Sequence, residues 1–99
     1  MEIIKEAKDS DLKICLKGRL DTSTAPQLEE AIKNSITGVK SLTLDLKDLE
    51  YMSSAGLRII LSAQKIMNRQ GNLTIRNVND TIMEVFEMTG FYKLFEIRE

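Results

Sequence analysis

Three segments of this chain place an apolar residue at every second position. They are residues 11–17, 41–46 and 72–76, and the residues between their leucines and isoleucines are mostly polar. A period of two is typical of a β-strand with one buried face. Helical patterns separate these segments, and strands that alternate with helices predict an α/β fold with parallel pairing through right-handed crossovers.

Three helices are expected, each indicated by apolar residues three or four positions apart and by a glycine near its end. A loop over Gly18–Thr24 precedes the first helix, for which Thr22, Ser23 and Thr24 are candidate N-caps; Asn79-Asp80 can cap the third. The expected helices run up to Thr37-Gly38, from Ala55 to Gln70 with Gly71 as C′ residue, and over 81–89 before Gly90.

A further strand completes the predicted sheet. Residues 2–7 and 11–17 are expected to form an antiparallel hairpin, because Lys8-Asp9-Ser10 supplies turn-forming side chains. The stretch 94–97 is expected to be a short final strand or a helical ending. Clean alternation favours helices on one face of the sheet and water on the other. The sequence therefore predicts one α/β domain over residues 1–99, with a mixed four- to five-stranded sheet and helices packed on one face.

Charge and hydropathy exclude several kinds of partner. The chain has 14 basic and 15 acidic residues, for a formal net charge of −1. Direct binding of nucleic acid needs an excess of Lys and Arg, so no nucleic-acid partner is expected. No apolar run approaches the ~20 residues that span a bilayer. We therefore expect a cytoplasmic protein with no membrane partner, and a monomer when free.

The usual signatures of an enzyme are missing from the sequence. It has no His, and its single cysteine, Cys15, is expected to be a half-buried strand residue without an activating partner. The acidic residues Asp45, Asp48 and Glu50 are expected to face water along a strand end. We therefore expect no catalytic residue, no metal and no cofactor.

The segment Asp48–Leu57 differs from an ordinary connection between a strand and a helix. Ser53 and Ser54 stand at the expected helix start, and Ala55-Gly56 leave its first turn open. A helix N-terminus has unpaired N–H groups and a partial positive charge, which favour a phosphate as ligand or modification. A serine there is also a common N-cap. Both interpretations hold if one hydroxyl caps the helix and the other stays exposed.

This segment resembles the signature of the anti-sigma factor antagonists, whose domain is called the STAS domain. Gly18-Arg19-Leu20-Asp21 with the following Ser/Thr cluster resembles a second marker of that family, and Met88–Phe95 resembles a third. The spacing of these motifs and the order of elements match along essentially the whole chain.

The resemblance implies a phosphorylation switch. In the family, the unphosphorylated protein binds an anti-sigma factor that is itself a serine kinase, and a sigma factor is released. Phosphorylation of Ser54, with Ser53 as the alternative site, ends the binding, and a serine phosphatase restores it. By position, the partner-binding residues would be Asp21, Thr22, Ser23, Ser53, Ser54, Ala55, Gly56 and Arg58.

Two alternatives keep the fold and change the role. The chain could serve as a non-phosphorylated scaffold, or as an accessory subunit of a signalling or lipid-transport complex. Nucleotide binding at the helix start is the other alternative, although the loop has no phosphate-binding Lys. Arg58, one turn after Ser54, is expected to point outward, where it is either solvated or pairs with a phosphate or partner.

Overall fold

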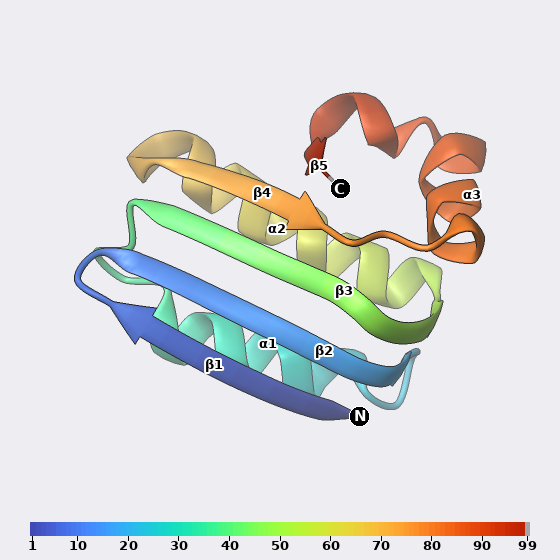
Figure 1. Ribbon diagram of the computed structural model, residues 1–99, viewed down its shortest axis with the longest axis horizontal. Helices are drawn as coiled ribbons and strands as arrows, with labels where there is room; N and C mark the ends of the chain where they lie inside the picture. Colours follow the sequence, from blue (N-terminus) through green and yellow to red (C-terminus); the bar gives the residue numbers. More distant parts are fainter. Residues whose placement is uncertain (99) are drawn as a thin grey trace.

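The period-two segments form a five-stranded sheet in the computed structural model, which describes residues 1–98. The strands are β1 (Glu2–Lys8), β2 (Asp11–Leu20), β3 (Ser41–Met52), β4 (Asn72–Arg76) and β5 (Glu96–Arg98). The helices are α1 (Ala25–Ser35), α2 (Ser54–Gln70), α3 (Asp80–Thr89) and the 3₁₀ helix η1 (Phe91–Leu94). β1 pairs antiparallel with β2 and all other neighbours are parallel, which confirms the predicted mixed sheet (Figure 1).

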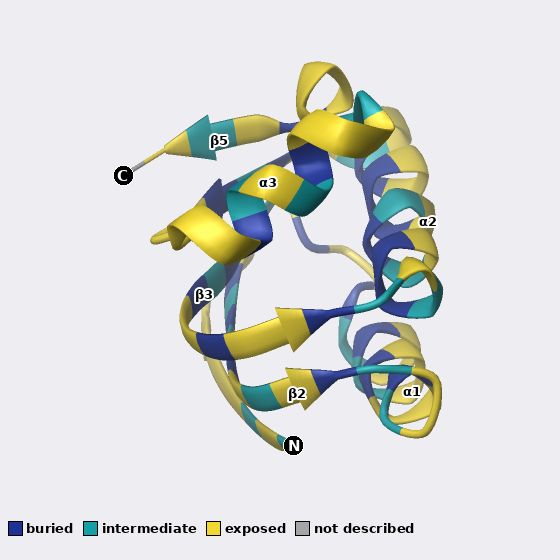
Figure 2. Ribbon diagram, turned by 90° about the vertical axis from the view of Figure 1, so that its right-hand side faces the viewer, coloured by how far each residue is buried: buried dark blue, intermediate teal, exposed yellow. Residues whose placement is uncertain are grey.

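Helices α1 and α2 lie side by side on one face of the sheet, as predicted, whereas α3 lies beyond the end of β4 (Figures 1 and 2). The strands lie in sequence order, so successive right-handed crossovers place their helices on the same face. Leu44 of β3 and Ile14 of β2 face these helices and are fully buried. None of the helices within residues 1–98 has the length and apolar character needed to cross a membrane.

Strand β3 is longer than the sequence predicts. The expected strand ended at Leu46 and a short connection followed, but β3 continues to Met52. Its pairing with β2 shifts register twice, so that β3 holds one extra residue at each of two β-bulges. The buried residues Leu46, Leu49 and Met52 are therefore three positions apart, and the alternation that identified the strand is lost.

Strand β2 also extends beyond its predicted end. Gly18, Arg19 and Leu20 were expected to lie in a loop, and this expectation is wrong, because β2 ends at Leu20. Gly18 has a φ of 104°, which suits glycine, and the chain returns Leu20 to the buried face. The glycine marks an irregularity inside the strand, next to a β-bulge.

The ends of α2 and α3 agree with the predicted capping residues, whereas α1 ends at Ser35, before the expected Thr37-Gly38. Asn79 caps α3, and Gly90 closes it with a left-handed φ of 74°. Gly71 follows α2, but its φ is −179°, which is extended backbone. A Cβ at Gly71 would overlap the carbonyl oxygen of Lys40, so this glycine is required for close approach of two chain segments. The C-terminal stretch contains both expected forms, η1 followed by β5.

Candidate functional site

Strands β2 and β3 end side by side and lead into α1 and α2 respectively (Figure 2). The backbone N–H of Ser53 donates to the carbonyl oxygen of Leu20 at 2.8 Å, which ties the two strand ends together. The two sequence motifs therefore meet in space although about 30 residues separate them. We call residues 19–24 and 51–58 the paired-loop surface.

The start of α2 divides its two serines between two roles. Ser53 is the N-cap, with extended backbone, and its Oγ accepts from the backbone N–H of Gly56 at 3.4 Å. Ser54 is the first helical residue and its side chain is exposed. The first turn of α2 holds no acidic residue. The expectation that one hydroxyl caps while the other stays exposed is confirmed, and it leaves the Ser54 hydroxyl at the positive end of a 17-residue helix.

Gly56 allows close packing beneath the site. It is buried, and a Cβ on Gly56 would overlap the side chain of Leu20 and stand only 2.7 Å from its Cδ2. The glycine therefore lets the first turn of α2 pack directly on the end of β2. Ala55 is half-buried, and Arg58 is exposed one turn after Ser54, as expected.

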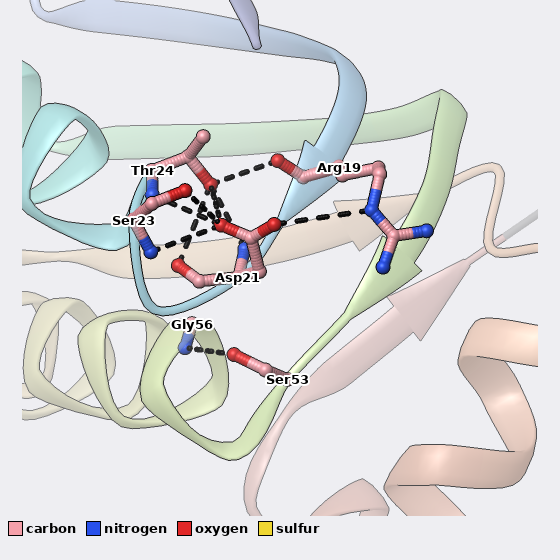
Figure 3. A network of polar contacts seen from close by, with 6 residues as sticks. All are labelled: Arg19, Asp21, Ser23, Thr24, Ser53 and Gly56. Atoms are coloured by element: carbon pink, nitrogen blue, oxygen red, sulfur yellow. Dashed lines mark hydrogen bonds and ion pairs between the residues drawn. The ribbon is translucent and has the colours of Figure 1, made fainter.

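The loop after β2 is organised by Asp21. Its Oδ1 accepts hydrogen bonds from Ser23 N at 3.0 Å, Ser23 Oγ at 2.7 Å and Thr24 N at 3.1 Å (Figure 3). These bonds, led by the one from the Ser23 hydroxyl, hold the pKa of the Asp21 carboxyl below its usual value. Asp21 is therefore an anion at neutral pH, held in place by hydrogen bonds from its own loop.

The candidate N-caps of α1 act differently from expectation. Thr24 occupies the N-cap position but makes no side-chain capping bond. Its hydroxyl instead donates to the carbonyl oxygen of Arg19 at 2.8 Å and accepts from the backbone N–H of Asp21 at 2.8 Å. Thr22 and Ser23 are exposed in the loop. The Thr24 hydroxyl thus ties the loop to β2 and does not cap the helix.

Arg19 and Tyr51 belong to the site but were not predicted as site residues. They are register partners at the ends of β2 and β3, and the guanidinium carbon of Arg19 lies 4.3 Å from the centre of the Tyr51 ring. Arg19 Nε also lies 3.8 Å from Asp21 Oδ2. Both residues stand within the motifs noted in the sequence. Their contact depends on the β3 bulge beside Glu50, which no local pattern shows.

Of the other titratable candidates, Asp45 and Cys15 lie away from this surface, whereas Asp48 and Glu50 are exposed, as expected, and Glu50 directly precedes it. Asp45, on the open face of the sheet, accepts from the Asn77 amide at 3.1 Å and lies 3.7 Å from the ammonium of Lys13. Burial raises the pKa of Asp45, but the hydrogen bonds from Asn77 and from the backbone N–H of Lys47, together with the charge of Lys13, outweigh burial, and the net pKa is lowered. Cys15 is half-buried as expected, and burial raises the pKa of its thiol, which disfavours a reactive thiolate.

Comparisons with known proteins agree with the geometry. Residues 2–99 match the family model described as the STAS domain. The anti-sigma-B factor antagonist of Listeria monocytogenes is 33% identical over 99 residues, covering 96% of this chain and 85% of that protein. A crystal structure of an anti-sigma factor antagonist from Mycobacterium paratuberculosis has a TM-score of 0.88 at 24% identity, covering 97% of this chain and 83% of that one. The phosphorylated form of SpoIIAA from Bacillus has a TM-score of 0.77 at 20% identity, covering 99% and 92%.

Proposed function

The chain belongs to the STAS domain family of anti-sigma factor antagonists, and from this premise we propose that phosphorylation of Ser54 switches its binding to an anti-sigma factor. The unphosphorylated chain binds an anti-sigma factor that is also a serine kinase, and this binding releases a sigma factor in the cytoplasm. A serine phosphatase resets the switch. One observation carries the proposal: Ser54 is exposed at an uncompensated helix N-terminus while Ser53 caps it.

The physical basis of the switch is local. A phosphate on Ser54 adds roughly −1.5 to −2 charges at neutral pH. Asp21 follows Leu20, whose carbonyl binds Ser53, so the new charge arises beside a loop that already holds a fixed anion. A partner packed on Ser54 must then desolvate or repel the phosphate. A loss of about 3 kcal/mol weakens binding more than a hundredfold, and no change of fold is needed.

Two findings support this assignment. Sequence relatives that cover nearly the whole chain are anti-sigma-B factor antagonists, and proteins of this family are regulatory. SpoIIAA, which shares the fold, has been solved in its phosphorylated form. In this proposal the chain is the substrate of a kinase and performs no catalysis. The residues predicted to bind the partner come from two segments, 21–23 and 53–58, which lie next to each other in the paired-loop surface. Gly56 is buried beneath that surface.

Phosphopeptide mapping tests the proposal. The full chain is incubated with ATP and each candidate serine kinase of the same organism, and intact mass and peptide masses are recorded. We expect one kinase to add a single phosphate that Ser54→Ala abolishes. Ser53→Ala is the matched control: it removes the neighbouring hydroxyl at a cost of about 1 kcal/mol in helix stability and should still be phosphorylated.

The opposite results are equally informative. A phosphate that persists in Ser54→Ala and disappears in Ser53→Ala moves the switch to Ser53. If no kinase modifies the chain, the phosphorylation proposal fails. A non-phosphorylated scaffold, or an accessory subunit of a signalling or lipid-transport complex, then becomes the assignment to test.

A further inference from the structure

The paired-loop surface has a small excess of positive charge before any modification, and the exposed Glu50 lies just outside it. Its charged side chains are Arg19, Asp21 and Arg58, two cations and one anion, so the formal net charge is +1. The N-terminus of α2 adds a partial positive charge, because its first turn has no acidic residue. The unmodified surface therefore suits an anionic partner group.

The single anion of this surface has little capacity left for a partner. Asp21 Oδ1 already accepts from the backbone N–H and hydroxyl of Ser23 and from the backbone N–H of Thr24. The other oxygen, Oδ2, faces Arg19 Nε at 3.8 Å. A partner's hydrogen-bond donor at Oδ2 would compete with Arg19 for this oxygen. Asp21 thus acts within the surface, as the group that holds the loop and orients Arg19.

Arg19, in contrast to Asp21, has hydrogen-bond donors left for a partner. Its side chain is 60% exposed, and among residues 1–98 its ion pair runs through Nε to Asp21. The Tyr51 ring lies beneath the guanidinium. Tyr51 contacts one face of the guanidinium and Asp21 contacts its Nε side, so its plane is restrained. The two terminal amino groups are left for a partner. A planar guanidinium with two parallel donors matches a carboxylate, and Arg and Tyr are enriched at interface hot spots.

We propose that Arg19, held by Tyr51 and Asp21, is a specificity-determining residue of the paired-loop surface and binds a carboxylate of an acidic segment on the anti-sigma factor. This inference rests on the proposed function, because it names the chemistry of that partner's contact. It also explains the direction of the switch. A phosphate of roughly −1.5 to −2 charges on Ser54 makes the surface net negative, so an acidic segment is first attracted and then repelled.

Binding measurements with matched variants test the role of Arg19. The affinity of the full chain for the anti-sigma factor kinase that phosphorylates it is measured at low and high salt. Arg19→Ala should bind about 10- to 100-fold more weakly, with a smaller salt dependence. Arg19→Lys should recover only part of this loss, and Arg19→Glu should bind more weakly than Arg19→Ala. Arg69→Ala, at the far end of α2, should stay within about twofold of wild type.

Tyr51→Leu separates recognition from folding. This variant keeps Arg19 and removes the ring that supports it, so its affinity should fall less than that of Arg19→Ala. Thermal unfolding of each variant is recorded beside the affinity. Arg19 is exposed, and exposed ion pairs contribute little to stability, so Arg19→Ala should unfold near the wild-type temperature.

Each contrary outcome has a definite meaning. If Arg19→Ala binds as well as Arg69→Ala, or Arg19→Glu binds as well as Arg19→Ala, the carboxylate contact is overturned while the proposed function stands. The proposed function itself fails if wild type binds no anti-sigma factor, or if Ser54→Asp does not weaken binding. The inference about Arg19 fails with it in that case.

Discussion

Helices α2 and α3 begin with the same backbone geometry and differ in the charge of their first turn. The N-caps Ser53 and Asn79 have ψ values of 172° and 170°, and each accepts a backbone N–H from the residue three positions later. The next residue is Asp80 in α3 but Ser54 in α2. A carboxylate compensates the positive end of α3, whereas α2 carries a hydroxyl at the corresponding position.

The two helix starts also differ in how they are anchored. Three positions after the cap, α3 has the fully buried Ile82, and α2 has Gly56, which leaves its space to Leu20. The Asn79 amide additionally donates to the carbonyl oxygen of Leu49 at 2.8 Å. The start of α3 therefore has both a compensating charge and a buried anchor. The start of α2 is closely packed but has no acidic side chain in its first turn. A phosphate added to Ser54 would therefore supply the negative charge that this turn lacks.

The largest effect expected from this comparison is at Ile82. Ile82→Ala should lower the free energy of unfolding by about 2–5 kcal/mol, because it leaves a cavity under α3. Ile82→Val is the matched control and should cost only about 0.5–1.5 kcal/mol. Urea denaturation of both variants measures the difference. Equal costs would mean that α3 is not anchored by this side chain.

Gly56→Ala should destabilise the protein by about 1–3 kcal/mol, because the added methyl group overlaps Leu20. The test is a double-mutant cycle with Leu20→Ala, followed by chemical denaturation. In the Leu20→Ala background the added methyl group has room, so the cost of Gly56→Ala should fall by at least about 0.5 kcal/mol. An unchanged cost would show that the requirement for glycine lies elsewhere.

Removal of the N-cap side chains of α3 and α2 should show which cap contributes more to the free energy of unfolding. Asn79→Ala should cost about 1–2 kcal/mol, since the cap bond to Ile82 N is 2.9 Å long and the bond to Leu49 is lost as well. Ser53→Ala should cost about 0.5–1 kcal/mol, because its cap bond is 3.4 Å long. Thermal unfolding of both variants ranks them, and the reverse order would contradict the comparison.

The smallest effects concern the charge at the first helical residue. Ser54→Asp should stabilise the fold, and Asp80→Asn should destabilise it, by about 0.3–1 kcal/mol each at low ionic strength. Unfolding measured at low and at high salt provides the check, since salt screens a charge–dipole interaction. Effects of the same sign at the two positions, or effects unchanged by salt, would contradict this account.

Elements defined by local chemistry could be predicted from the sequence. The alternating strands over 41–46 and 72–76, the Asn79 cap and the Gly90 closure all follow from short-range patterns, and the structure confirms them. The same local reasoning identified Ser53 and Ser54 as a helix start. The resemblance of that segment to a known family then supplied a function that spacing alone does not contain.

Features that depend on a distant neighbour were missed. The second half of β3 was not recognised, because its bulges exist only relative to β2. The reasons for Gly56 and Gly71 are close approaches to Leu20 and Lys40, which lie far away in the sequence. The contact between Arg19 and Tyr51 likewise follows from strand register. In each case two segments together determine the structure, and one segment read alone does not show it.

The two bulges of β3 impose a constraint on insertions and deletions. Each bulge bends and twists the end of β3, so removal of one residue between Leu46 and Ser53 would take out an extra residue that a bulge holds and change the direction of the strand end. The ends of β2 and β3, which hold Arg19 and Tyr51, would then meet with a different local twist. Exposed positions such as Lys47 and Glu50 can therefore change in identity, whereas the number of residues in this stretch has to be preserved for Ser54 to keep its place.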